Sequence, residues 1–350
     1  MSAAAAARPS IDVVVPALDE EGHISRCLDR ILAQDYPAEL VRVWVVDAGS
    51  TDRTAAIVAE RATREPRLAI VPNESGERLN AAQAVNRGVA AGEAELVARV
   101  DAHTYLAPDY LSAAVAAFAA ADAETACVGG QPEQVGETVF GRAVALARGS
   151  RVGVGGSVYA DRRGQAAVDT VQAGVYRRLD LERLGGFDPS VPFGEDEELN
   201  WRLRQSGSQI LLDTSLRFEY VTRSTWKALF RQHRNYGESR AHVVSIHPDY
   251  LRPYHLAPAG LVSAFALTAA AAPWSRHGRR ALAVLTALYG GTVLAGGAAA
   301  ARSEPRLAPR VAAAIAAMHL GYGVGMLEVA ARHLLAGRGT DVQARPLRQR

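Results

Sequence analysis

Lysine, cysteine and net charge are all scarce in this chain of 350 residues. Lys227 is the only lysine, so any mechanism that needs a lysine elsewhere is excluded. The two cysteines, Cys27 and Cys127, stand far apart in apolar surroundings without metal-ligand spacing, and we predict that both are buried and reduced. The net charge of +2, without a basic stripe interleaved with aromatic residues, argues against a nucleic-acid partner.

Two phosphate-binding motifs and a signal peptide are also missing. No Gly-x-Gly-x-x-Gly follows the first predicted strand and no P-loop lysine exists, so neither a dinucleotide fold nor a P-loop is supported. Residues 2–7 lack the basic start and the long apolar core of a signal peptide, and Arg8 and Pro9 interrupt them. We therefore expect a disordered tail at residues 1–9.

Predicted strands and helices alternate from residue 10 onward. The first strand is a run rich in β-branched residues closed by Pro16, which is typical of a buried parallel strand. The helix after it has an apolar stripe at helical spacing. Strands are predicted at residues 11–16, 42–47, 68–71 and 96–100, and helices at 24–32, 53–62 and 80–91. This α/β alternation predicts a Rossmann-like, mostly parallel sheet with helices on both faces.

Three aspartates stand where predicted strands end: Asp19, Asp47 and Asp101. Each alone is also typical of a turn or a helix cap. Together they converge on the crevice beyond the carboxyl ends of the strands, where parallel sheets bind ligands. His103 follows Asp101 by two residues, a spacing that lets both side chains face one divalent ion holding a diphosphate. The alternative for this pair is a polar turn.

A run of four acids, Glu195 to Glu198, leads into an amphipathic helical pattern. Repulsion among the four carboxylates raises the pKa of at least one of them towards the value that a general base needs near neutral pH. The alternative is that the acids are solvated and complement the positive end of a helix. Gly207 is the predicted end of that helix.

Four ordered motifs resemble those of the family 2 glycosyltransferases, which have the GT-A fold. The motifs are Val13-Val14-Val15-Pro16-Ala17-Leu18-Asp19-Glu20-Glu21, Val45-Val46-Asp47-Ala48-Gly49-Ser50-Thr51-Asp52, Arg99-Val100-Asp101-Ala102-His103 and Glu195-Asp196-x-x-Leu. The resemblance covers residues 10–245. Within the family, the stretches at 101–104, 154–157, 168–171 and 196–202 are most similar to the ExoA-type enzymes of succinoglycan assembly.

This resemblance implies a donor site, a metal site and a catalytic base. The implied nucleotide-sugar-binding residues are Pro16, Asp19, Glu20, Asp47, Arg78 and Asp101. A divalent metal, Mn²⁺ or Mg²⁺, would be held by Asp101 and His103, where His103 replaces the aspartate that the family usually has. Asp196 is the implied catalytic base and Glu195 its neighbour on the acceptor side, and attack opposite the leaving group inverts the anomeric centre.

Gln232 and Arg234 lie where processive members of the family carry Gln-x-x-Arg-Trp. Gln232 matches that motif, whereas Asn235 and Tyr236 depart from it, which favours the addition of a single sugar. We predict that Gln232 and Arg234 serve the acceptor or the leaving group. The alternative for this stretch is an amphipathic interfacial helix.

The composition becomes apolar after Pro258, in three segments at residues 259–272, 281–301 and 311–331. A membrane span needs about 20 such residues, so the second and third segments are long enough and the first is marginal. The placement of arginines favours crossing by the last two segments only, with soluble helices as the alternative. This topology leaves the catalytic half in the cytoplasm, at the cytoplasmic membrane, and suggests a lipid-linked acceptor.

The predicted organisation is a nucleotide-sugar half at 10–103, an acceptor half at 104–245, a membrane-associated helical region at 246–335 and a basic tail at 336–350. The predicted activity is the inverting, metal-dependent transfer of a sugar from a nucleotide-sugar, expected to be a UDP-sugar. The acceptor would be a hydroxyl of a lipid-linked saccharide in exopolysaccharide or cell-surface glycan assembly. The alternatives are a non-catalytic membrane scaffold of a polysaccharide assembly complex and a sugar nucleotidyltransferase, whose glycine-rich loop and lysine are missing.

Overall fold

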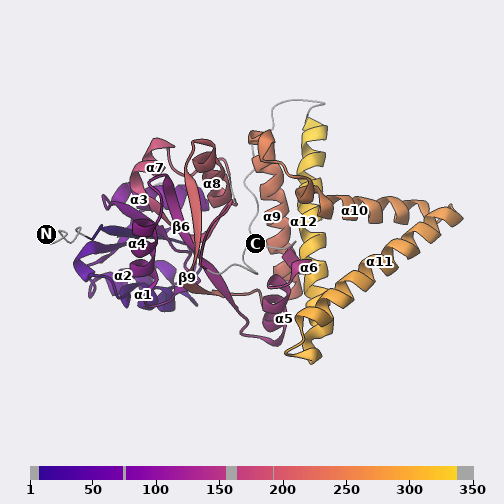
Figure 1. Ribbon diagram of the computed structural model, residues 1–350, viewed down its shortest axis with the longest axis horizontal. Coiled ribbons are helices and arrows are strands. Elements are labelled where there is room, and N and C mark those ends of the chain that lie inside the picture. Colours follow the sequence, from indigo (N-terminus) through magenta and orange to yellow (C-terminus); the bar gives the residue numbers. More distant parts are fainter. Residues whose placement is uncertain (1–7, 74–75, 155–163, 192, 337–350) are drawn as a thin grey trace. The chain divides into compact units, whose positions relative to one another are not determined.

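A computed structural model describes residues 8–73, 76–154, 164–191 and 193–336. Most of the two predicted tails, and residues 155–157 of the stretch at 154–157, lie outside these ranges. The chain divides into a sheet unit, residues 1–137 and 156–222, and a helical unit, residues 138–155 and 223–350 (Figure 1). The boundary predicted at residue 245 therefore falls inside the helical unit.

The sheet unit is built on a nine-stranded sheet with the order β3-β2-β1-β4-β8-β6-β9-β5, and β7 pairs with β9. Strands β1, β2, β3 and β4 are parallel, as predicted, whereas β8 runs antiparallel to both β4 and β6, so the sheet is mixed. The strands are β1 (Ile11–Ala17), β2 (Val41–Asp47), β3 (Leu68–Val71), β4 (Leu96–Arg99), β5 (Thr104–Leu106), β6 (Thr125–Val135), β7 (Gln165–Ala167), β8 (Gln172–Arg177) and β9 (Gln209–Val221).

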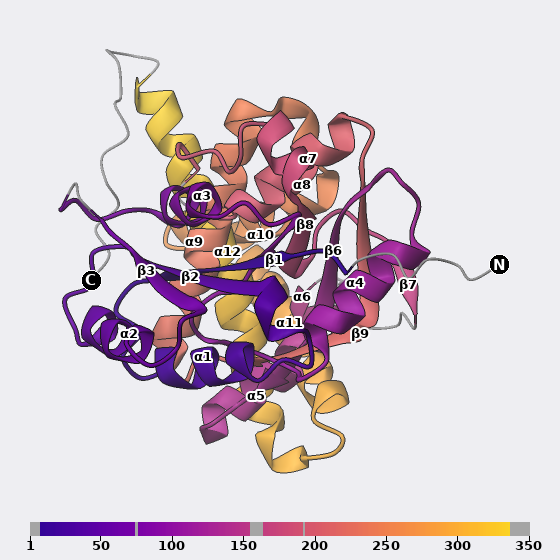
Figure 2. The ribbon, with the colours of Figure 1, turned by 90° about the vertical axis from the view of Figure 1, so that its left-hand side faces the viewer.

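Helices cover both faces of this sheet, as predicted (Figure 2). One face packs against α1 (Ile24–Leu32), α2 (Thr54–Ala62) and α4 (Tyr110–Ala120), and the other against α3 (Ala81–Ala91), α7 (Arg178–Arg183) and α8 (Glu195–Gln205). Cys27 is buried in the first core and Cys127 in the second, and both are free thiols. The prediction that the cysteines are buried and reduced is confirmed.

A buried ion pair ties the start of α7 to the first strand. Arg178 donates from Nη2 to Asp12 Oδ2 at 2.6 Å, and Trp44 donates from Nε1 to Asp12 Oδ1 at 2.7 Å. The Asp12 carboxylate also accepts from the backbone N–H of Ala94 at 2.9 Å. Gly92 allows this close approach, because a Cβ there would lie 2.1 Å from Asp12 Oδ2.

The helical unit contains α5 (Val139–Arg148), α6 (Arg151–Val154), α9 (Trp226–Ile246), α10 (Pro253–Ala271), α11 (Arg276–Ala300) and α12 (Ala308–Ala336). Helices α9 and α12 lie side by side with their backbones in close contact at glycines (Figure 1). A Cβ at Gly237 would lie 2.0 Å from the carbonyl oxygen of Tyr322, and one at Gly325 would lie 2.0 Å from that of Arg234. Small residues at such contacts let helix backbones approach each other.

Helices α10, α11 and α12 are each long and apolar enough to cross a membrane. The expectation that the first apolar segment is marginal was wrong about its length, because α10 begins at Pro253 and continues through Pro258 to reach 19 residues. Proline is tolerated at the first helical position, where its missing N–H has no partner to lose. An interior proline removes one further hydrogen bond without ending this helix.

Candidate active site

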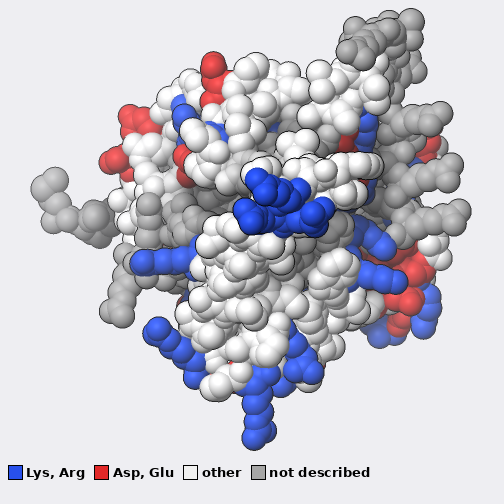
Figure 3. All heavy atoms as spheres, turned by 90° about the vertical axis from the view of Figure 1, so that its right-hand side faces the viewer, with Lys and Arg blue, Asp and Glu red and all other residues white. Residues whose placement is uncertain are grey.

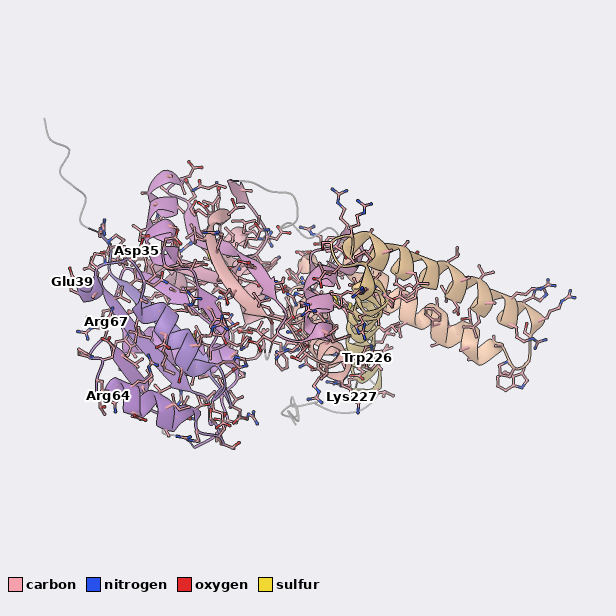
Figure 4. The ribbon with its side chains drawn as sticks, turned by 90° about the horizontal axis from the view of Figure 1, so that it is seen from below. Asp35, Glu39, Arg64, Arg67, Trp226 and Lys227 are labelled. Carbon is pink, nitrogen blue, oxygen red and sulfur yellow. The ribbon has the colours of Figure 1, made fainter. Side chains whose placement is uncertain are left out.

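The three predicted aspartates follow neighbouring parallel strands. Strand β1 pairs with both β2 and β4, so Asp19, Asp47 and Asp101 are brought to the same edge of the sheet. The opposite edge of the sheet, at the amino ends of the strands, carries Glu39 before β2 and Arg67 before β3 (Figure 4). Ligands of such sheets bind beyond the carboxyl ends, which identifies the edge with the aspartates as the candidate site.

Asp19 and Arg78 lie together in this site. Asp19 has a left-handed backbone, with φ 55°, and its Oδ1 accepts a hydrogen bond from the N–H of Thr51 at 2.7 Å. Arg78 donates from Nη2 to Asp19 Oδ2 at 3.3 Å. Asp47 accepts from the N–H of Ser50 at 3.2 Å and shapes the loop after β2. Pro16, the other predicted donor-binding residue of this stretch, lies within strand β1 and not in the loop that follows it.

The second group of predicted residues joins Asp101, His103 and Glu20. His103 Nδ1 lies 2.8 Å from Glu20 Oε1, and the His103 ring packs edge-on against Tyr220. Burial acts against the charged imidazole, but the hydrogen bond and negative charge of Glu20 outweigh it and raise the pKa of His103 to about 9. Glu20, predicted as a donor-binding residue, is thus the carboxylate that orients His103.

These residues fit a divalent metal that is shared with a diphosphate. Glu20 occupies Nδ1 of His103 and leaves Nε2 as the remaining ring nitrogen, the arrangement in which proteins usually orient a metal-ligating histidine. A divalent ion would displace the proton that Nε2 carries in the absence of metal. The Asp101 carboxylate is 42% exposed, and only its Oδ1 contacts Arg99. No cluster of three or more potential metal ligands occurs among the described residues, so phosphate oxygens and water would complete the coordination, as is common for Mg²⁺.

The four acids from Glu195 to Glu198 form the first turn of α8, as the helix-start interpretation of this run predicts. Gly194 precedes it with φ 70°, the helix ends at Gln205, and Gly207 follows in a left-handed conformation. Glu195 is 3% exposed and Asp196 retains 27% exposure, so these two acids are not simply solvated charges.

Arg99, which was not among the predicted site residues, lies between Asp101 and the acids at the start of α8. Its Nη2 lies 2.6 Å from Glu195 Oε1 and 3.3 Å from Asp101 Oδ1, and its Nη1 lies 4.0 Å from Asp196 Oδ2. The Arg99 side chain is 12% exposed. The signal in the sequence was a charged residue in a short apolar strand directly before Asp101.

Asp196 has the protonation behaviour expected of a general base. Burial raises the pKa of Asp196 to about 7, and the negative charges of Glu195, Glu197 and Asp101 act in the same direction. Arg99 opposes this shift without cancelling it. A base is most effective when its pKa lies near the working pH. Asp196 therefore combines partial exposure with a suitable affinity for a proton.

Glu198, the last acid of the run, is not a solvated charge. Its side chain is fully buried and binds Arg202 with two hydrogen bonds, at 2.6 and 2.7 Å. Arg202 in turn donates to the carbonyl oxygens of Leu184 and Gly186. Glu198 therefore anchors α8 to the turn after α7.

Gln232 and Arg234 both lie on α9 in the helical unit. Gln232 is buried, and Arg234 forms an ion pair with Glu328 of α12, in which Arg234 Nε donates to Glu328 Oε1 at 3.1 Å. Their assignment to the acceptor or leaving group stays a prediction.

Comparison with known proteins identifies relatives over much of the chain. The model of Glycosyl transferase family 2 matches residues 12–170. Succinoglycan biosynthesis protein ExoA of Rhizobium meliloti (strain 1021) is 34% identical over 235 residues, which are 65% of this chain and 68% of that protein. A dolichyl N-acetyl-alpha-D-glucosaminyl phosphate 3-beta-D-2,3-diacetamido-2,3-dideoxy-beta-D-glucuronosyltransferase of Methanococcus voltae is 25% identical over 258 residues, 72% of this chain and 78% of that protein.

The solved structure of mannosyltransferase PcManGT from Pyrobaculum calidifontis, in complex with GDP-Man and Mn²⁺, is also similar. It superimposes with a TM-score of 0.58 and 25% sequence identity over 89% of this chain and 87% of that chain. The region matched by the family model includes Asp19, Asp47 and Asp101 and ends before Asp196.

Proposed function

Because the chain belongs to glycosyltransferase family 2, we propose that it is an inverting, metal-dependent enzyme that transfers a sugar from a nucleotide-sugar to a saccharide hydroxyl. The observation that carries this proposal is the position of Arg99 between Asp101, on the donor side, and Glu195 and Asp196, on the acceptor side. Arg99 thus contacts both Asp101, the proposed ligand of the metal that would bind the diphosphate, and Asp196, the proposed base, whose pKa is raised to about 7.

On the donor side, Asp19 and Asp47 would hold the nucleotide and Arg78 would fix Asp19. Asp101 and His103 would hold the metal, Mn²⁺ or Mg²⁺, which when bound neutralises charge on the departing diphosphate. The PcManGT complex contains GDP-Man and Mn²⁺, which supports a nucleotide-sugar with a divalent metal as the ligand class. The predicted donor remains a UDP-sugar, and GDP-mannose is the alternative donor to be tested beside it.

On the acceptor side, Asp196 would accept the proton of the attacking hydroxyl. The acceptor oxygen then forms a bond to the anomeric carbon as the bond from that carbon to the diphosphate breaks on the opposite face. The configuration at the anomeric carbon is inverted, and the nucleoside diphosphate leaves. General base catalysis of this kind contributes roughly 10²–10⁴-fold to the rate. Glu195 would hold the geometry by way of Arg99.

We further propose a lipid-linked saccharide acceptor in exopolysaccharide or cell-surface glycan assembly. The names of the two relatives, one in succinoglycan biosynthesis and one acting on a dolichyl-linked sugar, support this class. Three apolar helices support placement at a membrane, and the supply of nucleotide-sugars supports a cytoplasmic catalytic unit. Gln232 and Arg234 remain the proposed acceptor or leaving-group residues, and a single sugar is added.

The central test replaces Asp196 by asparagine in the purified full chain. We expect Asp196→Asn to lower donor-dependent release of nucleoside diphosphate by at least about 10²-fold, because the amide cannot accept the proton. The assay would compare UDP- and GDP-sugars, each with Mn²⁺ and with Mg²⁺. Asp109→Asn, the same change at an exposed carboxylate before α4, is the matched control and should retain activity.

Unchanged transfer by Asp196→Asn would overturn the assignment of the base. No transfer by the wild-type chain with any donor would favour the membrane scaffold. Release of pyrophosphate from a nucleoside triphosphate and a sugar phosphate would favour the sugar nucleotidyltransferase.

A further inference from the structure

Helices α10 and α11 form a hairpin, and they are the least buried of the three candidate membrane spans. Only 11% of the apolar window of α10 and 17% of that of α11 is buried, against 56% for the window that includes α12. Large apolar side chains stand exposed along the hairpin: Leu267, Trp274, Val284, Leu288 and Leu294, with exposed fractions from 57% to 85%. A continuous apolar surface of this kind marks contact with a membrane or another protein.

Helix α12 has different surroundings, although its composition is similar. Its residues Val311, Ile315 and Met318 belong to a buried cluster with α5 and α9, and the glycine contacts hold its later turns against α9. Lys227 and Arg231 are exposed on α9, and Arg142 is exposed on α5. Figure 4 shows Lys227 at the start of α9. If α12 crossed a bilayer, these helices would carry their charges into the hydrocarbon with it, which is costly.

The two helices of the hairpin match the thickness of a bilayer. Helix α10 has 19 residues, and the uncharged part of α11 begins after Arg280. At 1.5 Å per residue, each of these stretches spans about 30 Å, the thickness of the hydrocarbon core. No Asp, Glu, Lys or Arg occurs between Arg252 and Arg276, or between Arg280 and Arg302.

Both ends of the hairpin have the residue types that favour a membrane interface. Trp274 is 85% exposed at the turn and Tyr254 is 66% exposed at the base, and such side chains are enriched at the headgroup level. Basic residues stand exposed directly after Trp274, namely Arg276, Arg279 and Arg280. Figure 3 views the helical unit from the side towards which the hairpin projects, and it shows a basic patch surrounded by uncharged surface.

We propose that α10 and α11 together cross a phospholipid bilayer as a hairpin, while α12 stays with α9 at the membrane surface. This differs from the expectation that the last two apolar segments cross. The distribution of arginines does not determine which end of the hairpin faces the cytoplasm, because the two ends carry similar numbers. Three arginines stand at the turn and four near the base, at 252, 302, 306 and 310. The inference rests on the membrane association in the proposed function and not on the sugar-transfer chemistry.

The test is the accessibility of single added cysteines in sealed, inverted membrane vesicles that hold the full chain. His277→Cys reports on the turn, Ser303→Cys on the loop between α11 and α12, and Ala59→Cys on the sheet unit, and all three positions are exposed. Native Cys27 and Cys127 are buried, so the wild-type chain serves as the background. We expect a membrane-impermeant maleimide to label positions 59 and 303 directly and position 277 only after detergent.

Labelling of 59 and 303 on one side and 277 on the other supports the crossing of α10 and α11 in either orientation. Leu334→Cys, exposed near the end of α12, then reports on that helix. Labelling of 334 on the side of 59 supports α12 at the membrane surface, and labelling on the side of 277 would show that all three helices cross. Labelling of 277 with 59, and of 303 only after detergent, would instead show that α11 and α12 cross. Labelling of 59 and 277 on opposite sides, with 303 accessible only from the side of 277, would also overturn the hairpin. Release of the whole chain by high salt would exclude any crossing.

A second measurement compares two charge insertions. Leu288→Arg places a charge midway along α11, where the side chain is 68% exposed, whereas Leu179→Arg places the same charge on α7 of the sheet unit, where the side chain is 79% exposed. We expect the first variant to lower the membrane-bound fraction several-fold and the second to leave it unchanged. Equal membrane-bound fractions in both variants would contradict the hairpin. Donor-dependent nucleotide release in detergent is measured separately, so failure of the topology is distinguishable from failure of the proposed function.

Discussion

Arg99 lies between Asp101, on the proposed donor side of the candidate site, and Glu195 and Asp196, on its proposed acceptor side. A largely buried guanidinium needs compensating charge, and here the carboxylates of Asp101, Glu195 and Asp196 supply it. The same charge opposes the rise in the pKa of Asp196. Arg99 is therefore a positioning residue that also sets how readily the proposed base takes up a proton.

This arrangement predicts two opposite changes in the pH dependence of transfer. In the wild-type chain, kcat/KM should fall about tenfold per pH unit below about pH 7, because Asp196 must be ionised to accept a proton. Glu195→Gln removes a negative charge that raises the pKa of Asp196, so this acidic limb should move to lower pH. Arg99→Gln removes the opposing positive charge, so the limb should move to higher pH. The measurement is kcat/KM against pH for each variant.

Arg99→Lys is the matched control, because it keeps the positive charge and should leave the limb close to its wild-type position. General damage to folding would lower activity at every pH without opposite shifts. An acidic limb that stays in place in all three variants would show that the titrating group is not Asp196.

The sequence predicted the individual site residues to different extents. Asp19, Asp47 and Asp101 were predictable because they follow strands whose parallel pairing brings their ends together. Glu198 was not, because nothing in a run of four acids distinguishes the buried partner of Arg202 from its neighbours. Arg99 was missed because its role depends on residues about 100 positions later in the chain.

At the level of elements, the Asp12–Arg178 pair fixes α7 to β1 across the sheet unit. Removing one partner of a buried ion pair leaves an uncompensated charge, at a cost of about 3–5 kcal/mol. We therefore expect Asp12→Asn to lower the thermal unfolding midpoint of the full chain in detergent. Asp29→Asn is the control, since Asp29 pairs with Arg61 at an exposed site and such pairs contribute about 1 kcal/mol or less. Equal midpoints for the two variants would contradict this role of Asp12.

The order of apolar and polar residues predicted the first four strands and the helices between them. Each of these strands is a short apolar run followed by a turn, and the first helix has apolar residues at helical spacing. The long strands β6 and β9 were harder to predict. β6 contains Gly129, Gly130 and Pro132, residues that are depleted in strands, and its pairing with β9 brings together segments far apart in the chain. The pattern underestimates the length of α10, because a proline such as Pro258 favours a helix boundary, whereas the helix continues through it.

At the level of the whole molecule, the candidate active site and three helices long and apolar enough to cross a membrane occur in one chain. The family match lies within the first half of the sequence, whereas the apolar helices follow residue 252. A soluble sugar acceptor would give the hairpin no role in transfer. An acceptor held in the membrane would instead be concentrated in the same layer as the enzyme, which raises its effective concentration.

The full chain in liposomes should therefore transfer sugar to a polyprenyl-diphosphate-linked saccharide with a lower KM than to the same saccharide free in solution. The difference in KM should shrink in detergent, at concentrations where acceptor and enzyme occupy separate micelles. The lower KM depends on acceptor and enzyme sharing one bilayer. The measurement is KM for both acceptors in both environments, with kcat recorded separately. Equal KM values in liposomes would refute the lipid-linked acceptor while leaving the role of Asp196 untouched, since the base acts on the hydroxyl and not on the carrier.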